Sequence, residues 1–87
     1  MVDAVSDPPR VVMELSFMTT DPYDLIPRIL DHARKSSIVI ERLTTERRVE
    51  SFDVVAVLAA PSDAVLETFK HRCTLVQTAI LVKQNPV

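Results

Sequence analysis

Glycine is absent from this sequence of 87 residues, although average usage of about 7% would place about six glycines in a chain of this length. Nucleotide-binding loops and nucleophile elbows need glycine where the backbone turns sharply or comes close to a phosphate. The absence therefore argues against a Walker loop, a dinucleotide-binding fingerprint and a nucleophile elbow.

Cysteine and histidine are scarce, with one cysteine and two histidines in the chain. Cys73 has no second cysteine to pair with, and His32 and His71 are too far apart in sequence for a zinc motif. Neither histidine belongs to a motif with a serine or cysteine nucleophile. The sequence therefore predicts no catalytic residue, no metal site and no bound cofactor.

Long apolar runs and a large net charge are absent too. The longest apolar run, residues 54–60, is far shorter than the roughly 20 residues that a membrane span needs. A net charge of -2 gives no overall attraction to nucleic acid or to an anionic membrane. The opening residues, MVDAVSDPPR, lack the basic segment and apolar core of a secretory signal. We therefore expect a cytoplasmic protein that binds neither nucleic acid nor a membrane.

The chain does contain 47% apolar and 25% charged residues, a composition typical of a folded globular domain. Its length suits one domain with a small core, which makes association with a partner or a second copy a reasonable expectation. Residues 1–10 include two adjacent prolines and few apolar residues, so we predict a flexible N-terminal arm. We predict one folded domain over residues 11–82 and a short C-terminal tail over residues 83–87.

Hydrophobic periodicity predicts strands at 11–18, 38–43, 52–60 and 75–82, with helices from about 22 to 35 and from about 62 to 73. Asp21 suits the N-cap of the first helix and Pro22 its first position, whereas a start with Asp24 as the cap would place Pro27 in the first turn. The order βαββαβ is that of an α+β, ferredoxin-like sandwich, with a four-stranded antiparallel sheet and both helices on one face.

Four segments carry a resemblance to a known family: DP after the first strand, ILDHARKSSIVIERL, VAVLAAPSDAVLETF and TLVQTAILV. Read together over residues 11–82, they resemble an ACT domain. Within that group the pattern is most similar to the short small subunit of acetohydroxyacid synthase, also called acetolactate synthase, of the isozyme II type. The resemblance rests on hydrophobic order, spacing and length.

This resemblance implies a non-catalytic regulatory subunit that binds and stabilises the catalytic large subunit of acetohydroxyacid synthase. In that family the large subunit carries thiamine diphosphate, magnesium and flavin. The main alternative is a stand-alone ACT-like module that senses an amino acid. An RNA-binding module of the same strand order is a third reading, but its aromatic platform is missing, because Phe17 and Phe52 are both assigned to the core.

The corner between the first strand and the first helix is a candidate effector site, because free amides at a helix N-terminus attract anions. ACT domains that bind amino acids usually have a glycine here, and this chain has Tyr23 and Asp24 instead. The carboxylates of Asp21 and Asp24 would repel the carboxylate of an amino acid. The sequence therefore argues against an amino-acid effector and favours a capping role for the acids. The corner comprises Thr19, Thr20, Asp21, Tyr23, Asp24 and Leu25.

The third strand is apolar on both faces, whereas two helices can cover only one face of a sheet. Its uncovered residues and those of the first strand would form an exposed apolar surface, which is typical of an interaction site. Unpaired sheet edges add a second means of association. We therefore expect a homodimer and a partner interface that includes Val12, Glu14, Val55 and Val57.

Overall fold

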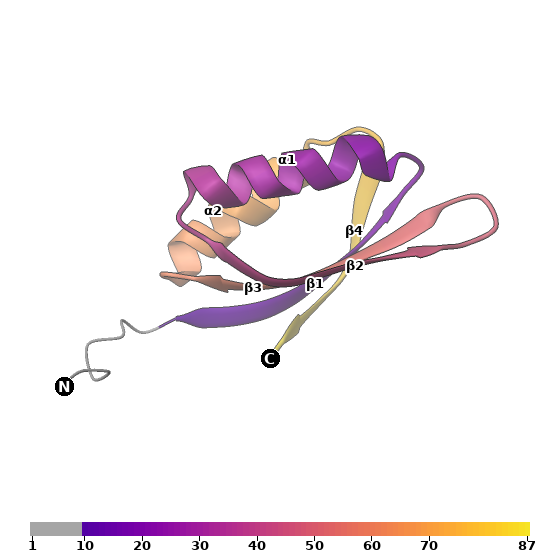
Figure 1. Cartoon of the computed structure of the whole chain (residues 1–87). Helices are drawn as coiled ribbons and strands as arrows, with labels where there is room; N and C mark the ends of the chain where they lie inside the picture. Colours follow the sequence, from indigo (N-terminus) through magenta and orange to yellow (C-terminus); the bar gives the residue numbers. More distant parts are fainter. Residues whose placement is uncertain (1–9) are drawn as a thin grey trace.

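The computed structural model describes residues 10–87, in which six elements follow one another in the order βαββαβ. They are β1 (Val11–Thr19), α1 (Pro22–Lys35), β2 (Val39–Arg47), β3 (Phe52–Ala60), α2 (Asp63–Thr74) and β4 (Ala79–Pro86). The strands form one antiparallel sheet in the order β2-β3-β1-β4. Both helices cover the same face of the sheet (Figure 1). The predicted ferredoxin-like architecture is confirmed.

The core lies between the helices and one pleat face of the central strands. Leu15 and Phe17 of β1 are buried beside Val54 and Ala56 of β3, because alternate residues of a strand point to the same side of the sheet. The helices contribute the rest of the buried apolar layer: Leu25, Ile29, Ala33, Leu66, Phe69 and Cys73. Among the described residues, no helix or strand covers the other pleat face of the sheet (Figure 1).

The structure decides between the two possible N-caps of α1, Asp21 and Asp24. Asp21 is the N-cap and Pro22 occupies the first turn, so the helix does not begin with Asp24 as its cap. Pro27 is therefore inside the helix, where it has no N–H to donate to the carbonyl of Tyr23. Both residues are exposed, so the missing hydrogen bond lies on the solvent side of the helix.

The helix α1 ends with a residue in the left-handed conformation, and that residue is a serine where glycine is usual. Ser37 has a φ of 58°, a region in which glycine is usual because it has no Cβ. The Ile38 N–H donates to the Ala33 carbonyl at 2.9 Å and the Ser37 N–H donates to the Arg34 carbonyl at 3.4 Å. This is the hydrogen-bond pattern of a Schellman motif, and buried Ile38 completes it with its side chain in the core.

Two strands differ in length or position from the sequence prediction. The β2 strand continues through Arg47, because the polar residues after Leu43 still pair with β3 along an exposed edge. The β4 strand runs from Ala79 to Pro86, later than predicted, because a turn with buried Val76 separates it from α2. The predicted C-terminal tail of residues 83–87 is wrong: Lys83 to Pro86 pair with β1.

The predicted N-terminal arm, residues 1–10, lies outside the described residues except for exposed Arg10. In the described part of the chain, neither helix has the length and apolar content that crossing a membrane would require.

Candidate functional site

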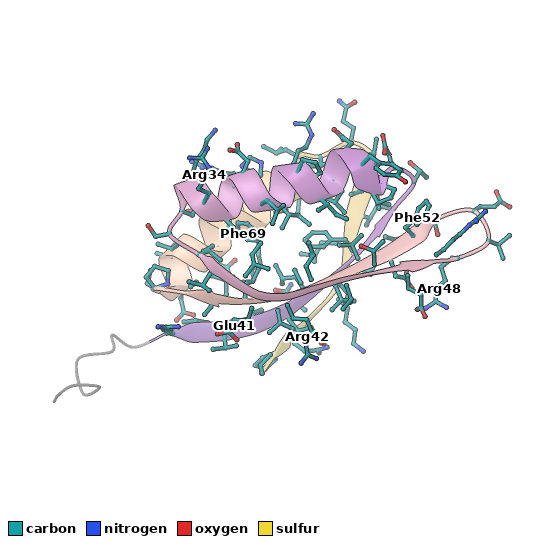
Figure 2. The ribbon with its side chains drawn as sticks, viewed as in Figure 1. Arg34, Glu41, Arg42, Arg48, Phe52 and Phe69 are labelled. Atoms are coloured by element: carbon teal, nitrogen blue, oxygen red, sulfur yellow. The ribbon has the colours of Figure 1, made fainter. Side chains whose placement is uncertain are left out.

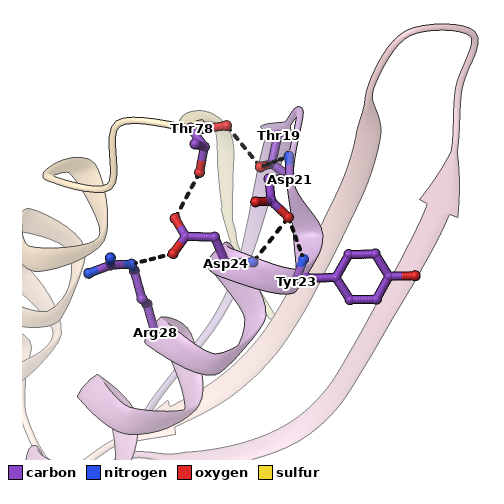
Figure 3. Close-up of polar contacts among 6 residues, drawn as sticks. All are labelled: Thr19, Asp21, Tyr23, Asp24, Arg28 and Thr78. Atoms are coloured by element: carbon purple, nitrogen blue, oxygen red, sulfur yellow. Dashed lines mark hydrogen bonds and ion pairs between the residues drawn. The ribbon is translucent and has the colours of Figure 1, made fainter.

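The β1–α1 corner, residues 19–25, is held together by hydrogen bonds within the chain (Figure 3). Thr19 Oγ1 accepts from the Asp21 N–H at 3.0 Å and donates to the Thr78 carbonyl at 2.8 Å. The Asp21 carboxylate accepts from the N–H groups of Tyr23 and Asp24, at 3.1 and 3.3 Å. Asp21 therefore caps α1, because its side chain accepts hydrogen bonds from the backbone of the first helical turn.

The remaining backbone donors of this corner also have acceptors. The Thr20 N–H donates to the Thr78 carbonyl at 3.1 Å, and the Leu25 N–H donates to the Asp21 carbonyl at 3.1 Å. Pro22 has no N–H. Each N–H from residue 20 to residue 25 is therefore paired within the described chain, and a ligand carboxylate would have to displace the Asp21 side chain to reach the helix N-terminus.

Asp24 joins the corner to two other parts of the fold (Figure 3). Its carboxylate accepts from Arg28 Nε at 2.9 Å and from the Thr78 hydroxyl at 3.1 Å. The hydrogen bond from Arg28, followed by the one from Thr78, holds the pKa of Asp24 below its ordinary value of 3.8. Asp24 is therefore ionised and already has partners at neutral pH.

The six predicted corner residues do not line one cavity. Thr19 and Leu25 are buried, whereas the Tyr23 ring extends away from the corner and is 88% exposed (Figure 3). Tyr23 and Asp24 instead border a hollow of about 270 Å³ along the outer side of α1, together with Arg28 and three further residues of that helix. Thr78 was missed by sequence reasoning, because it lies 54 residues from Asp24 and no local pattern marks it.

The four predicted interface residues do lie together, on the sheet face that the helices leave uncovered, here called the open sheet face. Glu14 is opposite Val57 in the β1–β3 register, and Val12 and Val55 are on the same pleat face. All four are partly exposed. Sequence reasoning thus placed these side chains on one surface, and the strand register makes them neighbours.

Arg42 belongs to the same surface and was missed as an interface residue. The β2–β3 register shifts between Ile40 and Arg42, which makes Glu41 a bulge residue and sets Arg42 opposite Val57. Figure 2 shows Glu41 and Arg42 on the side of the sheet away from the helices. The break in apolar alternation at these two residues was the available signal.

The open sheet face has no aromatic platform for RNA bases. Phe17 is buried in the core, and Phe52 shares the helix-facing pleat of buried Val54. The strand residues on the open sheet face are valine, alanine, isoleucine, methionine, serine, threonine, asparagine and charged residues instead. RNA-recognition modules of this strand order stack bases on aromatic rings of the central strands, and such rings are missing from the described strands on this face.

A second hollow, of about 350 Å³, lies between α1 and the connection from α2 to β4, and Arg28, His32, Lys35 and Arg72 contribute basic groups to it. Arg28 is paired with Asp24 at 2.9 Å and Lys35 with Asp31 at 3.0 Å. Basic residues in a last helical turn also complement the helix dipole. His32 Nδ1 has no partner among the described residues, but it is inaccessible and cannot reach a ligand in the hollow. We assign no ligand there.

Neither a reactive thiol nor a metal-binding group is found among the described residues. Burial raises the pKa of the Cys73 thiol to about 12, so the thiol is protonated at neutral pH and is a poor nucleophile. Within residues 10–87, no three His, Cys, Asp or Glu side chains are grouped so that they could hold a metal ion.

Comparison with known proteins identifies the fold and not a family. Neither a family model nor a curated protein matches the sequence. The C-terminal domain of the MgtC protein from Mycobacterium tuberculosis superposes with a TM-score of 0.77 over 94% of this chain and 93% of that chain, at 13% identity. The ACT domain from GTP pyrophosphokinase of Chlorobium tepidum gives a TM-score of 0.71 over 88% of this chain and all of that domain, also at 13% identity.

This chain has an ACT-like fold. The de novo designed protein Foldit4 is also similar, with a TM-score of 0.70, 17% identity and coverage of 91% of this chain and 97% of that one. A designed sequence therefore matches about as well as a natural ACT domain does. The likeness establishes how the backbone is arranged, and function has to be argued from the surfaces.

Proposed function

We propose that this chain is a non-catalytic regulatory module that acts by associating with another protein chain. The observation that carries the proposal is the open sheet face, where Val12, Val55 and Val57 are partly exposed and no element of the described chain covers them. Contiguous apolar surface of this kind is typical of an interaction site. The protonated, buried Cys73 and the paired corner residues support a binding role over a catalytic one.

The finer form of the proposal is a small regulatory subunit of acetohydroxyacid synthase. It rests on the sequence resemblance, and the ACT-like fold is consistent with it. In this role the chain would bind the catalytic large subunit, which in that family carries the cofactors. The chain can raise activity only by binding the competent state of the large subunit more tightly than its other states.

A reconstitution experiment tests this proposal. The purified chain is titrated into the large subunit of acetohydroxyacid synthase from the same organism, and the rate of acetohydroxyacid formation is followed. We expect no synthase activity from the chain alone and a saturable increase in large-subunit activity on mixing. No change in rate at saturating chain would refute the synthase role.

Two lysine variants locate the contact. Val57→Lys places a charge on the open sheet face, and Thr68→Lys places the same side chain at an exposed position of α2. If association uses the open sheet face, Val57→Lys lowers the apparent affinity and Thr68→Lys does not. Circular dichroism confirms that both variants are folded. Equal effects of the two variants would argue against the open sheet face as the surface used.

A stand-alone module that senses an amino acid is the second candidate, favoured by the structural likeness to the ACT domain from GTP pyrophosphokinase. The fully paired amides of the β1–α1 corner count against it, because an amino-acid carboxylate would find no free backbone donor there. Binding of free amino acids distinguishes the two candidates directly.

A further inference from the structure

Both outer strands of the sheet carry irregularities that oppose pairing with another chain at an edge. On β2 the register shifts at Glu41, and on β4 it shifts at Val82, which lies between Leu81 and Lys83 in the pairing with β1. A bulge bends and twists an edge strand, and Pro86 at the end of β4 has no N–H to donate. Association between copies is therefore more favourable through the open sheet face than through an edge.

The open sheet face has a symmetric arrangement about β3. Val57 has Arg42 of β2 on one side and Glu14 of β1 on the other. Ala59, one step along the same pleat, lies between two valines, and Val55 lies between a threonine and a serine. On the two strands that flank β3, a charged residue is therefore opposite a charged residue, a valine opposite a valine, and a hydroxyl residue opposite a hydroxyl residue.

Neither Arg42 nor Glu14 forms an ion pair within residues 10–87. With strands spaced about 4.8 Å apart, their backbones are separated by about 10 Å across Val57, with the valine side chain between them. Each therefore has an unused charge beside a partly exposed apolar strip.

We propose that two copies of this chain pack through their open sheet faces about a two-fold axis that runs close to the direction of β3. This operation lays β3 on β3 and β2 on β1 of the second copy. Arg42 of each copy then faces Glu14 of the other, twice per dimer, while Val57 faces Val57. Stacked sheets are about 10 Å apart, a distance that arginine and glutamate side chains can bridge together.

Other two-fold axes leave the same charges without partners. An axis between β3 and β1 would set Glu14 on Val57 and Arg42 on the neutral Asn85. An axis perpendicular to the strands, midway between the rows of Val57 and Val55, would set Glu14 on a serine and Arg42 on a threonine. A perpendicular axis through the row of Val57 would set each charge against its own copy. A buried unpaired charge is strongly unfavourable, so charge complementarity selects the axis along β3.

The other charges near this surface are compatible with the arrangement. Asp53 would approach its own symmetry copy, but Arg48 Nε lies 2.5 Å from its carboxylate and neutralises it within each chain. The β4 strand of one copy would extend past β2 of the other, which brings Lys83 toward the edge that carries Glu41 and Glu46.

This assembly rests on the proposed function and makes a second copy the chain that covers the open sheet face. A catalytic chain would then contact the dimer through another surface, and Val57→Lys would weaken that association by disrupting the dimer.

Charge reversal tests the pairing with the isolated chain in analytical ultracentrifugation over a concentration series. Arg42→Glu places two carboxylates against each other in the dimer, and Glu14→Arg places two guanidinium groups there, so each variant should dimerise about a hundredfold more weakly than the unmodified chain. An equimolar mixture of the two variants should form a heterodimer, since each reversed charge then meets its opposite. The double variant should recover self-association.

Arg34→Glu, on the helix side (Figure 2), is the matched control and should leave dimerisation unchanged.

Three results would overturn this inference. They are a monomer at every concentration, a dimer that neither reversal weakens, and folded single variants whose mixture stays monomeric. The second result would point to an edge contact. None of these measurements involves a large subunit, so the dimer model and the synthase proposal can fail independently.

Discussion

The β1–α1 corner and the open sheet face differ in whether their polar and apolar groups have partners within the same chain. At the corner, Asp21, Asp24 and Thr19 pair with backbone or side-chain partners of the same chain. On the open sheet face, Val55 and Val57 stay partly exposed, and neighbouring Arg42 has no ion pair among the described residues.

The comparison indicates that exposed apolar side chains and unpaired charges are a better guide to a binding surface than the position of a site in the fold. The corner was the candidate effector site from the sequence, yet its backbone donors are paired within the chain. The open sheet face has no motif, yet it presents apolar area and charge that a second chain could cover. Three measurements can break or sharpen this contrast.

The largest expected effect comes from exchanging a hydroxyl for a methyl group at the corner. Thr19→Val removes the buried hydroxyl that pairs with the Asp21 N–H and the Thr78 carbonyl, and we expect the free energy of unfolding to fall by about 1–3 kcal/mol. The reverse exchange, Val57→Thr on the open sheet face, should change it by no more than about 0.5 kcal/mol. Urea denaturation at matched protein concentration measures both, and equal costs would remove the contrast.

A smaller effect concerns pH and Asp24. Because its folded pKa is below the ordinary value of 3.8, ionised Asp24 contributes stability that is fully present above about pH 5 and is lost as pH falls through the folded pKa. Asp24→Asn should therefore lower stability at neutral pH, and its difference from the unmodified chain should shrink in acid. Arg28→Gln should remove part of the same contribution, so the double variant should lose less than the sum of the two. A pH-independent difference would mean that the carboxylate charge is unimportant.

The smallest expected effect concerns amino-acid binding, for which we expect no signal. Calorimetry with valine, leucine and isoleucine at millimolar concentration should give no saturable heat, because the amides of the β1–α1 corner are paired within the chain. A dissociation constant in the micromolar range would favour the sensing module instead. If Asp24→Ala created valine binding, the carboxylate would be a device that excludes the effector.

Sequence patterns predicted the order of helices and strands and offered Asp21 as one of two caps for α1, because both depend on residues close together in the chain. The antiparallel sheet then followed from that order. Sequence patterns misplaced β4, since Lys83 to Asn85 are polar and an edge strand with one uncovered face does not need apolar residues. They also left the start of α1 open, because Pro27 is tolerated only where its turn faces solvent.

The sequence by itself determined which residues alternate toward the core, the order of helices and strands, and that two helices would cover only one sheet face. These are consequences of strand and helix periods and of local capping. Only the tertiary structure decided that Thr78 would meet Asp24 and that a bulge at Glu41 would set Arg42 across Val57 from Glu14. Such neighbours depend on strand register and on elements packed from distant parts of the chain, because a one-residue shift in register reverses which face a side chain occupies.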